Sequence, residues 1–221
     1  MDVIKLASFV IDYCKNNNLN KIYICGNGTS GKTTFSKKIQ EKALKYGNVN
    51  LISTDDFMVD ENLKRNSICK WTEDGVQYTG RYTSSNVESY FLKNIYEILY
   101  NIDNGIDLYY FPRRYKENNN IRKLYSDYFL TIIEGMGTAF LEKDKKDSLT
   151  LLLKCSLADE IKRRKERTEK LSRDPIEMYD EKRSSQYRVN ILNNEDKYDF
   201  VIESDEKFDY KIIKGKCDYD R

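Results

Sequence analysis

The stretch that decides the fold is Gly26-Asn27-Gly28-Thr29-Ser30-Gly31-Lys32-Thr33. It fits the pattern G-x-x-x-x-G-K-[ST] at every fixed position. A short apolar run at residues 21–25 precedes it and is typical of a buried strand. After it, apolar residues recur every three or four positions from Phe35 to Tyr46, which predicts an amphipathic helix. A strand, a glycine-rich loop and a helix in this order form the context that a phosphate-binding loop requires.

The chemistry of such a loop follows from its backbone. Glycines let the chain curl so that several N–H groups point at one anion, and the helix that starts near Gly31 adds the positive end of its dipole. Lys32 is expected to reach the β- and γ-phosphates of a nucleotide, and the Thr33 hydroxyl to bind Mg²⁺. The sequence therefore predicts ATP and Mg²⁺ as cofactors. The expected nucleotide-binding residues are Gly26, Asn27, Gly28, Thr29, Ser30, Gly31, Lys32, Thr33 and Thr34.

The composition excludes several classes of protein. Among 221 residues, 38 Lys and Arg face 36 Asp and Glu, and a net charge of +2 gives no reason to expect a nucleic-acid partner. There is no histidine, so any scheme that needs an imidazole is excluded. Five cysteines without a CxxC pair argue against disulfides and structural zinc. With no apolar run of bilayer length and no secretory signal, we expect a cytoplasmic protein without a membrane partner; a homo-oligomer stays open.

The rest of the chain continues the alternation of strands and helices. Short apolar runs predict further strands at residues 50–53, 107–111, 128–133, 149–155 and 198–202. Helical spacing predicts helices at about residues 2–15, 85–102 and from 156 onward, with another helix start at Asp174-Pro175. Residues from about 60 to 82 show no clear period and are interpreted as a loop or a short excursion.

These elements predict one α/β domain over residues 1–221. Alternating strands and helices indicate a three-layer fold, a parallel sheet with helices on both faces, and a binding site at the carboxyl ends of the strands. We expect an N-terminal helix within residues 1–18 and a lid segment at about residues 156–175.

Carboxylates follow two of the predicted strands. Asp55 and Asp56 come directly after the strand at residues 50–53, and Glu134 ends the run at residues 128–133. In a parallel sheet these ends lie on the same side as the phosphate loop, so one aspartate could take a proton from an attacking hydroxyl. Glu134 could hold Mg²⁺ or its bound water in place of the more usual aspartate. Turn capping by the aspartates and a solvent-exposed strand end are the alternatives.

Basic residues crowd the predicted lid. Seven Lys and Arg residues lie in the segment from Lys162 to Arg173, and on a helix Arg163 and Arg167 share a face, as do Arg164 and Arg167. Mobile arginines that close over a transferring phosphate stabilise its charge in the transition state. A solvated helix face is the better interpretation for most of them, so only two or three are expected to act.

The combination of motifs resembles the uridine kinase and phosphoribulokinase family of P-loop small-molecule kinases. The resemblance is carried by the phosphate loop, by Ser-Thr-Asp-Asp-Phe from Ser53, by Ile-Ile-Glu-Gly from Ile132 and by Arg-rich elements ending in Arg173-Asp174. It spans about residues 21–204 and implies a five-stranded parallel sheet of order 2-3-1-4-5. It also implies a kinase that transfers the γ-phosphate of ATP to a small-molecule hydroxyl, with a nucleoside as the leading acceptor.

The resemblance assigns roles by position. Asp55 would be the base and contact the acceptor, Glu134 would join Thr33 at Mg²⁺, and Lys32 would be catalytic. Arg164 and Arg167 would be catalytic lid residues, and Arg173 would bind the nucleotide. The acceptor would be lined by Phe57, Arg114 and Tyr115, the last two within the element Phe111-Pro-Arg-Arg-Tyr115, with surface packing of Tyr115 as the alternative.

Two departures bear on the acceptor. The family's uridine–cytidine kinases contact the pyrimidine through a histidine, which this chain lacks, and Met58 stands where nucleoside kinases usually carry an aromatic residue. Phosphoryl transfer is therefore the firmer expectation, and another sugar or vitamin hydroxyl stays open as acceptor.

Three rival functions remain at this stage. A nucleoside-monophosphate kinase could use Arg81, Arg113 and Arg114 for a second phosphate. A P-loop ATPase or GTPase switch would hydrolyse nucleotide to change partners, although the chain has no Asn-Lys-x-Asp guanine-reading element. A non-catalytic nucleotide-binding protein would bind ATP and transfer nothing, against which the residues at the loop, Asp55 and Glu134 argue.

Overall fold

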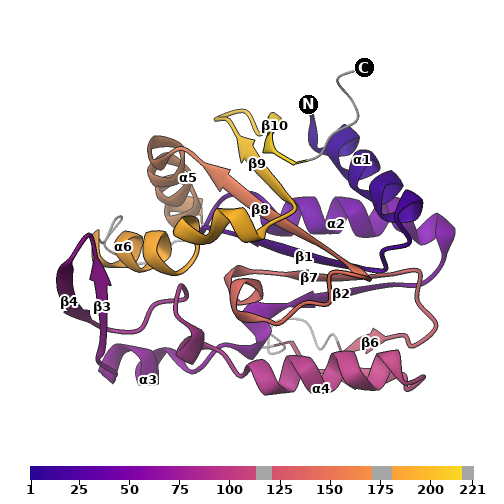
Figure 1. Ribbon diagram of the computed structural model, residues 1–221, viewed down its shortest axis with the longest axis horizontal. Coiled ribbons are helices and arrows are strands. Elements are labelled where there is room, and N and C mark those ends of the chain that lie inside the picture. The colour runs from indigo at the N-terminus through magenta and orange to yellow at the C-terminus, as the bar shows by residue number, and fades with distance from the viewer. Residues whose placement is uncertain (113–120, 171–180, 216–221) are drawn as a thin grey trace.

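The computed structural model describes residues 1–112, 121–170 and 181–215, with the side chains of residues 167–170 left aside. Its centre is a six-stranded sheet in the order β2-β7-β1-β8-β9-β10 (Figure 1). The bounds of these strands are β1 Lys21–Gly26, β2 Val49–Ser53, β7 Leu130–Glu134, β8 Ser148–Cys155, β9 Phe200–Ser204 and β10 Tyr210–Lys214.

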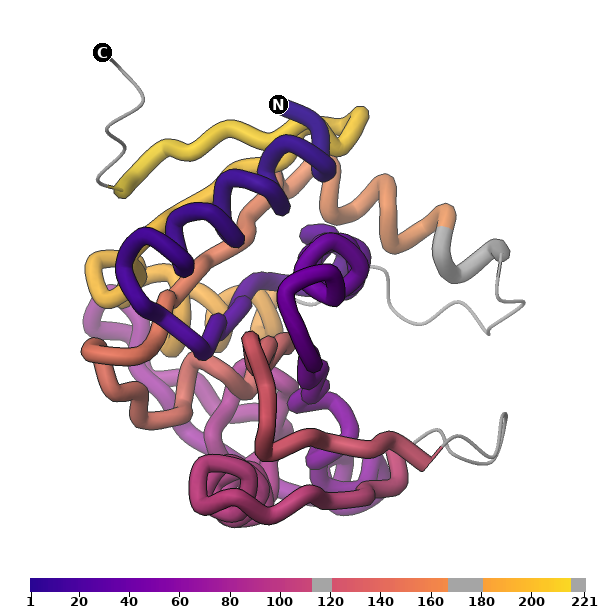
Figure 2. Tube along the Cα trace, turned by 90° about the vertical axis from the view of Figure 1, so that its right-hand side faces the viewer, coloured from indigo at the N-terminus to yellow at the C-terminus, as the bar shows by residue number. Residues whose placement is uncertain are grey.

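The sheet confirms the predicted α/β fold and differs from it by one strand. Its first five strands are parallel and, counted along the chain, follow the expected order 2-3-1-4-5. The sixth strand, β10, pairs antiparallel with β9 and was not expected. Figure 2 shows β10 running beside α1, and the backbone N–H of Tyr210 donates to the carbonyl of Met1 (2.7 Å). The strand β10 therefore forms one edge of the sheet, and the sequence pattern did not predict it.

Helices cover both faces of the sheet, because side chains alternate along each strand. On one face, Ile22 and Ile24 of β1 pack into a core with α1 and α2, and on the other face Tyr23 joins a core with α4. A third cluster places Cys25 under α6. The helices are α1 Val3–Asn16, α2 Lys32–Ala43, α3 Glu61–Asn66, α4 Leu92–Asp103, α5 Leu157–Lys170 and α6 Glu181–Asn190.

Short elements join these layers. Two small sheets flank the centre, formed by β3 Cys69–Glu73 with β4 Val76–Gly80 and by β5 Leu108–Tyr110 with β6 Arg122–Leu124. The 3₁₀ helices used below are η2 Thr54–Phe57, η3 Val87–Ser89, η5 Met136–Phe140 and η6 Leu192–Lys197; η1 Leu44–Tyr46 extends α2. In the described part of the chain, no helix combines the length and apolar character that crossing a bilayer requires.

Local predictions can be compared with the structure at three places. The segment at about residues 60–82, interpreted as a loop or a short excursion, contains α3 and the β3–β4 hairpin. The short strand predicted at residues 107–111 is present as β5, which pairs with β6 outside the central sheet. The helix expected from residue 85 begins only at Leu92. The further helix start predicted at Asp174-Pro175 lies outside the described residues.

The late start of α4 has a tertiary cause. The backbone N–H groups of Val59 and Phe91 donate to the carbonyls of Ser89 (2.9 Å) and Phe57 (2.8 Å), and Met58 forms a β-bridge with Tyr90. Pairing between these two segments keeps Tyr90 extended, so the capping residues upstream close only the single turn of η3.

Candidate functional site

The phosphate loop connects β1 to α2 at the carboxyl edge of the sheet. Gly26 ends β1, and Gly31 is the N-cap of α2 with φ +90°, a conformation that favours glycine. The Lys32 ammonium folds back across the loop and donates to the carbonyl of Asn27 (2.6 Å). Ser30 is buried within the loop, and Thr34 lies exposed on the first turn of α2. The residues predicted to bind a nucleotide therefore form one continuous turn with a cation lying over it.

Thr33 and Glu134 lie together at the mouth of this loop. The Thr33 hydroxyl is 3.4 and 3.5 Å from the two carboxylate oxygens of Glu134. Register explains the arrangement, because β2 and β7 are paired so that Ser53 stands opposite Glu134, and the Ser53 hydroxyl donates to Glu134 Oε1 (2.8 Å). Two neighbouring strands and the start of α2 thus aim three oxygen-bearing side chains at one point.

The environment of Glu134 is unusual for a carboxylate. Its side chain is buried, at 6% exposure, and this burial raises its pKa above the ordinary value. The positive charge of Lys32 and the hydrogen bond from Ser53 act in the opposite direction, whereas the negative charge of Asp55 raises the pKa further. A carboxylate that is costly to ionise alone is well placed to meet a cation.

The oxygen donors at this point fit Mg²⁺. Hydroxyl and carboxylate oxygens are the ligands that Mg²⁺ takes, and it usually uses only one or two carboxylates together with nucleotide phosphates. The described residues hold no group of three or more acidic or cysteine side chains that could bind a metal unaided. Thr33 and Glu134, with Ser53 beside them, would therefore hold the ion jointly with phosphate oxygens.

Asp55 lies on η2, directly after β2 and beside Glu134. Its side chain is exposed, and its charge contributes both to the raised pKa of Glu134 and to that of the buried Tyr90, whose pKa is raised chiefly by burial. The start of η2 is held against η5, because the N–H of Gly137 donates to Thr54 Oγ1 (3.2 Å). The two carboxylates expected to converge on the loop thus come from adjacent strand ends.

Asp56 points into a different environment. The Tyr110 hydroxyl donates to Asp56 Oδ2 (3.2 Å), and Arg122 Nη1 lies 4.0 Å from the same oxygen. Phe57 stacks on the Tyr110 ring at 5.7 Å between centroids. Asp56 is therefore occupied in holding the β5–β6 hairpin, which leaves Asp55 as the aspartate open to a ligand. Phe57, predicted to bind substrate, packs its ring at the edge of the α4 core.

The helix α5, which begins in the segment predicted as a lid, starts beside the phosphate loop. Arg164 forms an ion pair with Glu160 one turn earlier, and Asn27 donates to Glu160 Oε2. A Cβ atom added to Gly28 would lie 2.8 Å from Arg164 Nη2, so the guanidinium rests on the loop itself. The structure brings Arg164 to the nucleotide site, while the side chain of Arg167 and the whole of Arg173, Arg114 and Tyr115 lie outside the described residues.

Three residues at the site were not among the predicted site residues. Arg163 is buried and donates to the carbonyl of Thr29 (3.2 Å) and to Ser204 Oγ (3.1 Å), fastening α5 to the loop. Tyr90 lies near Asp55 and donates from its hydroxyl to the carbonyl of Ser84 (2.7 Å). Ser53 holds Glu134. Two of them lie in segments that the sequence singled out: Ser53 opens the run that ends in the two aspartates, and Arg163 belongs to the basic run from Lys162 to Arg173.

Comparison with solved structures supports the fold. The structure superposes on D-glycerate 3-kinase from Cryptococcus neoformans var. grubii with a TM-score of 0.59 and 10% identity over 96% of this chain and 99% of that one. A chain from Silicibacter sp. TM1040, provisionally assigned as a fructose transport system kinase, gives 0.51 and 13% over 88% and 92%. At such identities the likeness shows only that this chain shares the α/β fold of these two chains.

No protein-family model matches the chain, and no curated protein matches it. A structure from Bacillus stearothermophilus, described as a possible uridine kinase, reaches a TM-score of only 0.47 at 16% identity over 86% of this chain and 96% of that one. The resemblance to uridine kinases therefore stays a prediction.

Proposed function

We propose that this protein is an ATP-dependent kinase that transfers the γ-phosphate to a hydroxyl of a small molecule. The observation that carries the proposal is the convergence of Thr33, Glu134 and Asp55 at the mouth of a phosphate loop. Nucleotide binding alone needs the loop and Lys32. A second, exposed carboxylate beside the first is what a kinase needs to take a proton from an acceptor.

The residues divide the work of in-line transfer. The loop N–H groups and Lys32 hold the triphosphate, and Thr33 with Glu134 would hold Mg²⁺, which neutralises charge on the phosphates when bound. Asp55 accepts the proton of the acceptor hydroxyl as its oxygen bonds to the γ-phosphorus. The bond from that phosphorus to the bridging oxygen breaks, and ADP leaves with the electron pair. Arg164 approaches the loop from the lid and stabilises the charge that develops.

Three observations bear on the identity of the acceptor. The motifs resemble uridine kinases, which favours a nucleoside. Two of the solved structures that superpose with a TM-score above 0.5 are named for glycerate and for a fructose transport system, which adds hydroxy acids and sugars. The chain has no histidine to contact a pyrimidine. The feature that all these candidate acceptors share is an alcohol hydroxyl, and the proposal rests on that group.

An acceptor screen tests the proposal. Purified protein with Mg-ATP would be offered hydroxy acids, sugars, sugar phosphates, nucleosides, riboside vitamins and nucleoside monophosphates, and ADP release and phosphorylated product would be measured together. We expect one class to raise ADP release well above the rate without acceptor, with one phosphoester formed per ADP. Equal ADP release with and without every acceptor, and no phosphoester, would instead indicate a nucleotide hydrolase or a nucleotide-binding protein.

A further inference from the structure

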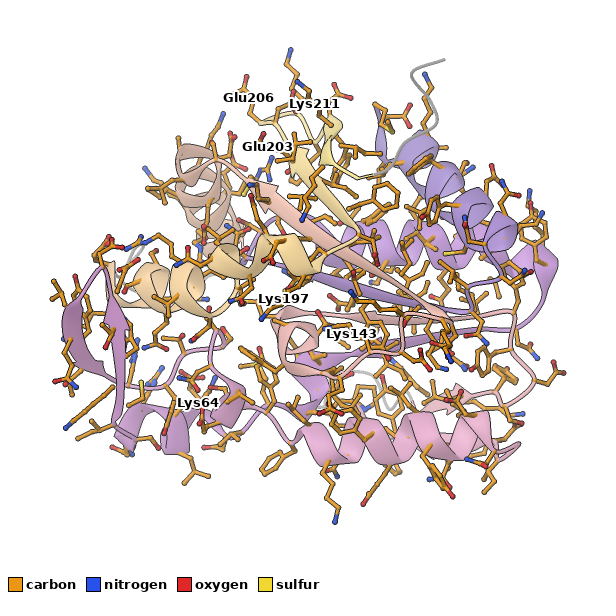
Figure 3. All side chains as sticks on the ribbon, in the orientation of Figure 1. Lys64, Lys143, Lys197, Glu203, Glu206 and Lys211 are labelled. Atoms are coloured by element: carbon orange, nitrogen blue, oxygen red, sulfur yellow. The ribbon has the colours of Figure 1, made fainter. Side chains whose placement is uncertain are left out.

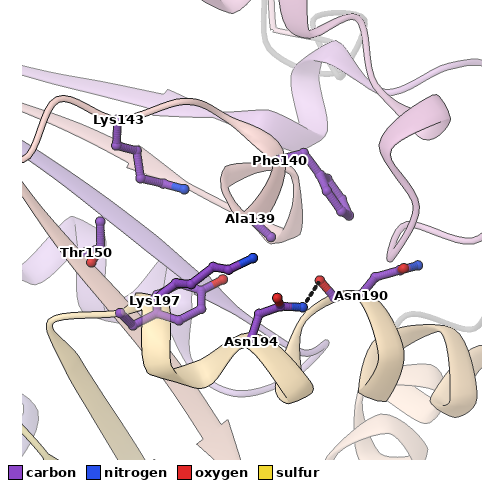
Figure 4. Close-up of a pocket in the computed structure, with 8 residues that line it drawn as sticks. Ala139, Phe140, Lys143, Thr150, Asn190, Asn194 and Lys197 are labelled. Atoms are coloured by element: carbon purple, nitrogen blue, oxygen red, sulfur yellow. Dashed lines mark hydrogen bonds between the residues drawn. The ribbon is translucent and has the colours of Figure 1, made fainter. Parts of the chain in front are cut away.

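A second concave site lies apart from the phosphate loop. It has a volume of about 220 Å³ and is enclosed by η5 and the residues after it, the beginning of β8, and the end of α6 with η6 (Figure 4). None of its lining residues belongs to the phosphate loop, to η2 or to the Ser53–Glu134 pair. The lining residues that matter below are Phe140, Lys143, Asn190, Asn194, Lys197 and Tyr198.

Two lysines converge on this cavity. Lys143 follows η5 and Lys197 ends η6, and both side chains reach into the space between these segments (Figures 3 and 4). Lys143 Nζ donates to the carbonyl of Leu141 (2.9 Å) and lies 5.6 Å from the centre of the Tyr23 ring. Across the described ranges, neither lysine forms an ion pair with a carboxylate. Two like charges therefore face one cavity without a balancing anion.

Two carboxylates of the neighbouring segments are occupied elsewhere. Glu195 of η6 pairs with Lys154 (2.9 Å), and Asp199 Oδ2 accepts from both the N–H and the hydroxyl of Thr150 (2.8 and 2.7 Å). Burial lowers the pKa of Lys143, and the positive charge of Lys197 lowers it further. A charge partly removed from water is normally paired, so the half-buried Lys143, with Lys197 beside it, favours an anionic ligand.

The other walls indicate what the anion is attached to. Phe140 and Tyr198 supply aromatic surface. Asn190 and Asn194 use their amide N–H groups on backbone carbonyls, of Ser85 (2.8 Å) and of Val189 (3.4 Å) respectively. Neither amide oxygen accepts a hydrogen bond among the described residues, so each can accept one from a ligand hydroxyl. The cavity thus combines cationic, aromatic and hydrogen-bond-accepting surface.

We propose that this cavity is a binding site for a small organic phosphate monoester, separate from the nucleotide site. A monoester carries a charge between about −1.5 and −2 at neutral pH, which two ammonium groups balance. The volume is below the roughly 300–1,000 Å³ of pockets for drug-sized ligands, so the organic part is small. Such a site can be filled while ATP occupies the loop, because the two share no residue.

Phenyl phosphate is the probe, titrated by calorimetry into the Lys32→Ala protein, whose weakened phosphate loop removes the competing site. We expect saturable 1:1 binding, at least about tenfold weaker in Lys143→Met and in Lys197→Met made in the same background, since a charged hydrogen bond is lost in each. Methionine keeps the length and apolar stem of lysine. Benzyl alcohol, which has the ring without the charge, should show no saturable binding.

Lys145→Met is the matched control, because Lys145 is exposed in the same segment and does not line the cavity. Its affinity for phenyl phosphate should equal that of the parent. The proposal is overturned by an absence of saturable binding in the Lys32→Ala protein, or by equal affinities in all three lysine variants. Should Lys143→Met fail to fold, as judged by circular dichroism, the exposed Lys197 decides the outcome alone.

Discussion

At the scale of single residues, the candidate site depends on how closely two chain segments approach. Gly135 follows Glu134 with φ +124°, and a Cβ atom there would lie 2.1 Å from Thr54 Oγ1. Thr54 precedes Asp55, so the gap between these segments sets the distance between the two carboxylates. Only a residue without a side chain permits both the backbone angle and the contact.

Gly135→Ala should therefore separate Asp55 from Glu134. We expect a loss of roughly 1–3 kcal/mol of stability from backbone strain, increased by the clash, and a large fall in phosphoryl transfer. Gly105→Ala is the control, because Gly105 also has positive φ (+83°) but meets nothing within 4 Å. Thermal denaturation should show a loss of stability from backbone strain in this variant too, but its transfer rate should stay unchanged. Equal transfer rates in the two variants would show that the contact does not position the site.

At the scale of elements, a buried arginine helps to attach α5 to the phosphate loop. Arg163 donates to the carbonyls of Thr29 and Asp205 and to Ser204 Oγ, and its guanidinium lies 4.0 Å from the centre of the Phe208 ring. Because Arg163 precedes Arg164 by one position, the two side chains leave the helix in different directions. Arg163 attaches α5 to the Thr29 carbonyl of the loop, and Arg164 lies against the loop at Gly28.

Arg163→Met should loosen this attachment. Loss of hydrogen bonds from a buried charged group should lower stability by about 1–3 kcal/mol and weaken ATP binding, because the Thr29 carbonyl loses its partner. Lys162→Met is the comparison, since its pair with Glu206 (3.4 Å) is more than half exposed on both sides. Urea denaturation and nucleotide titration of both variants would check this. A Lys162 variant as impaired as the Arg163 variant would contradict the attachment.

The β5–β6 hairpin has an electrostatic fastening of its own. Asp107 accepts from the N–H and hydroxyl of Ser126 (both 2.8 Å) and pairs with Lys123 (2.9 Å), which lowers its pKa to about 2. A depressed carboxylate pKa stabilises the fold above the unfolded value of 3.8, and this contribution is lost as pH falls through about 2.

Asp107→Asn should therefore melt at a lower temperature than the wild type at pH 7. The difference in Tm should narrow as pH falls from 3.8 towards 2, because the wild-type carboxylate becomes protonated. Asp127→Asn, an exposed substitution nearby, serves as the control for a general change in net charge. A Tm difference for Asp107→Asn that stayed constant over this range would contradict the assigned cause.

At the scale of the whole molecule, local patterns predicted what local physics determines. The buried parallel strands appear as apolar runs, and the phosphate loop carries its own signature, so the central layers and the nucleotide site could be placed from sequence. The β3–β4 hairpin had a usable signal as well. Asp74 and Gly75, both with positive φ (51° and 79°), form the tight turn that an Asp-Gly pair favours.

Features set by distant contacts could not be predicted in the same way. Asp55 was chosen over Asp56 through the family resemblance, but the contacts of Asp56 with Tyr110 and Arg122, more than fifty residues further along the chain, could not be predicted from local pattern. The start of α4 is set by pairing between the segments around Met58 and Tyr90. The edge strand β10 is specified by its partner β9 and by α1. In each case a tertiary contact overrides the local preference.

The proposed phosphoryl transfer requires Asp55 to accept the proton of the acceptor hydroxyl. The direct measurement is ³¹P NMR of phosphoester formation from Mg-ATP and the acceptor found by the screen, with nucleotide affinity measured in parallel, for wild type, Asp55→Asn and the control Asp56→Asn. We predict that Asp55→Asn keeps its affinity for ATP and loses roughly 10²–10⁴-fold in rate. Asp56→Asn, whose partners lie in the hairpin, should stay within about tenfold of the wild type. Phosphoester formed by Asp55→Asn at the wild-type rate would contradict the account.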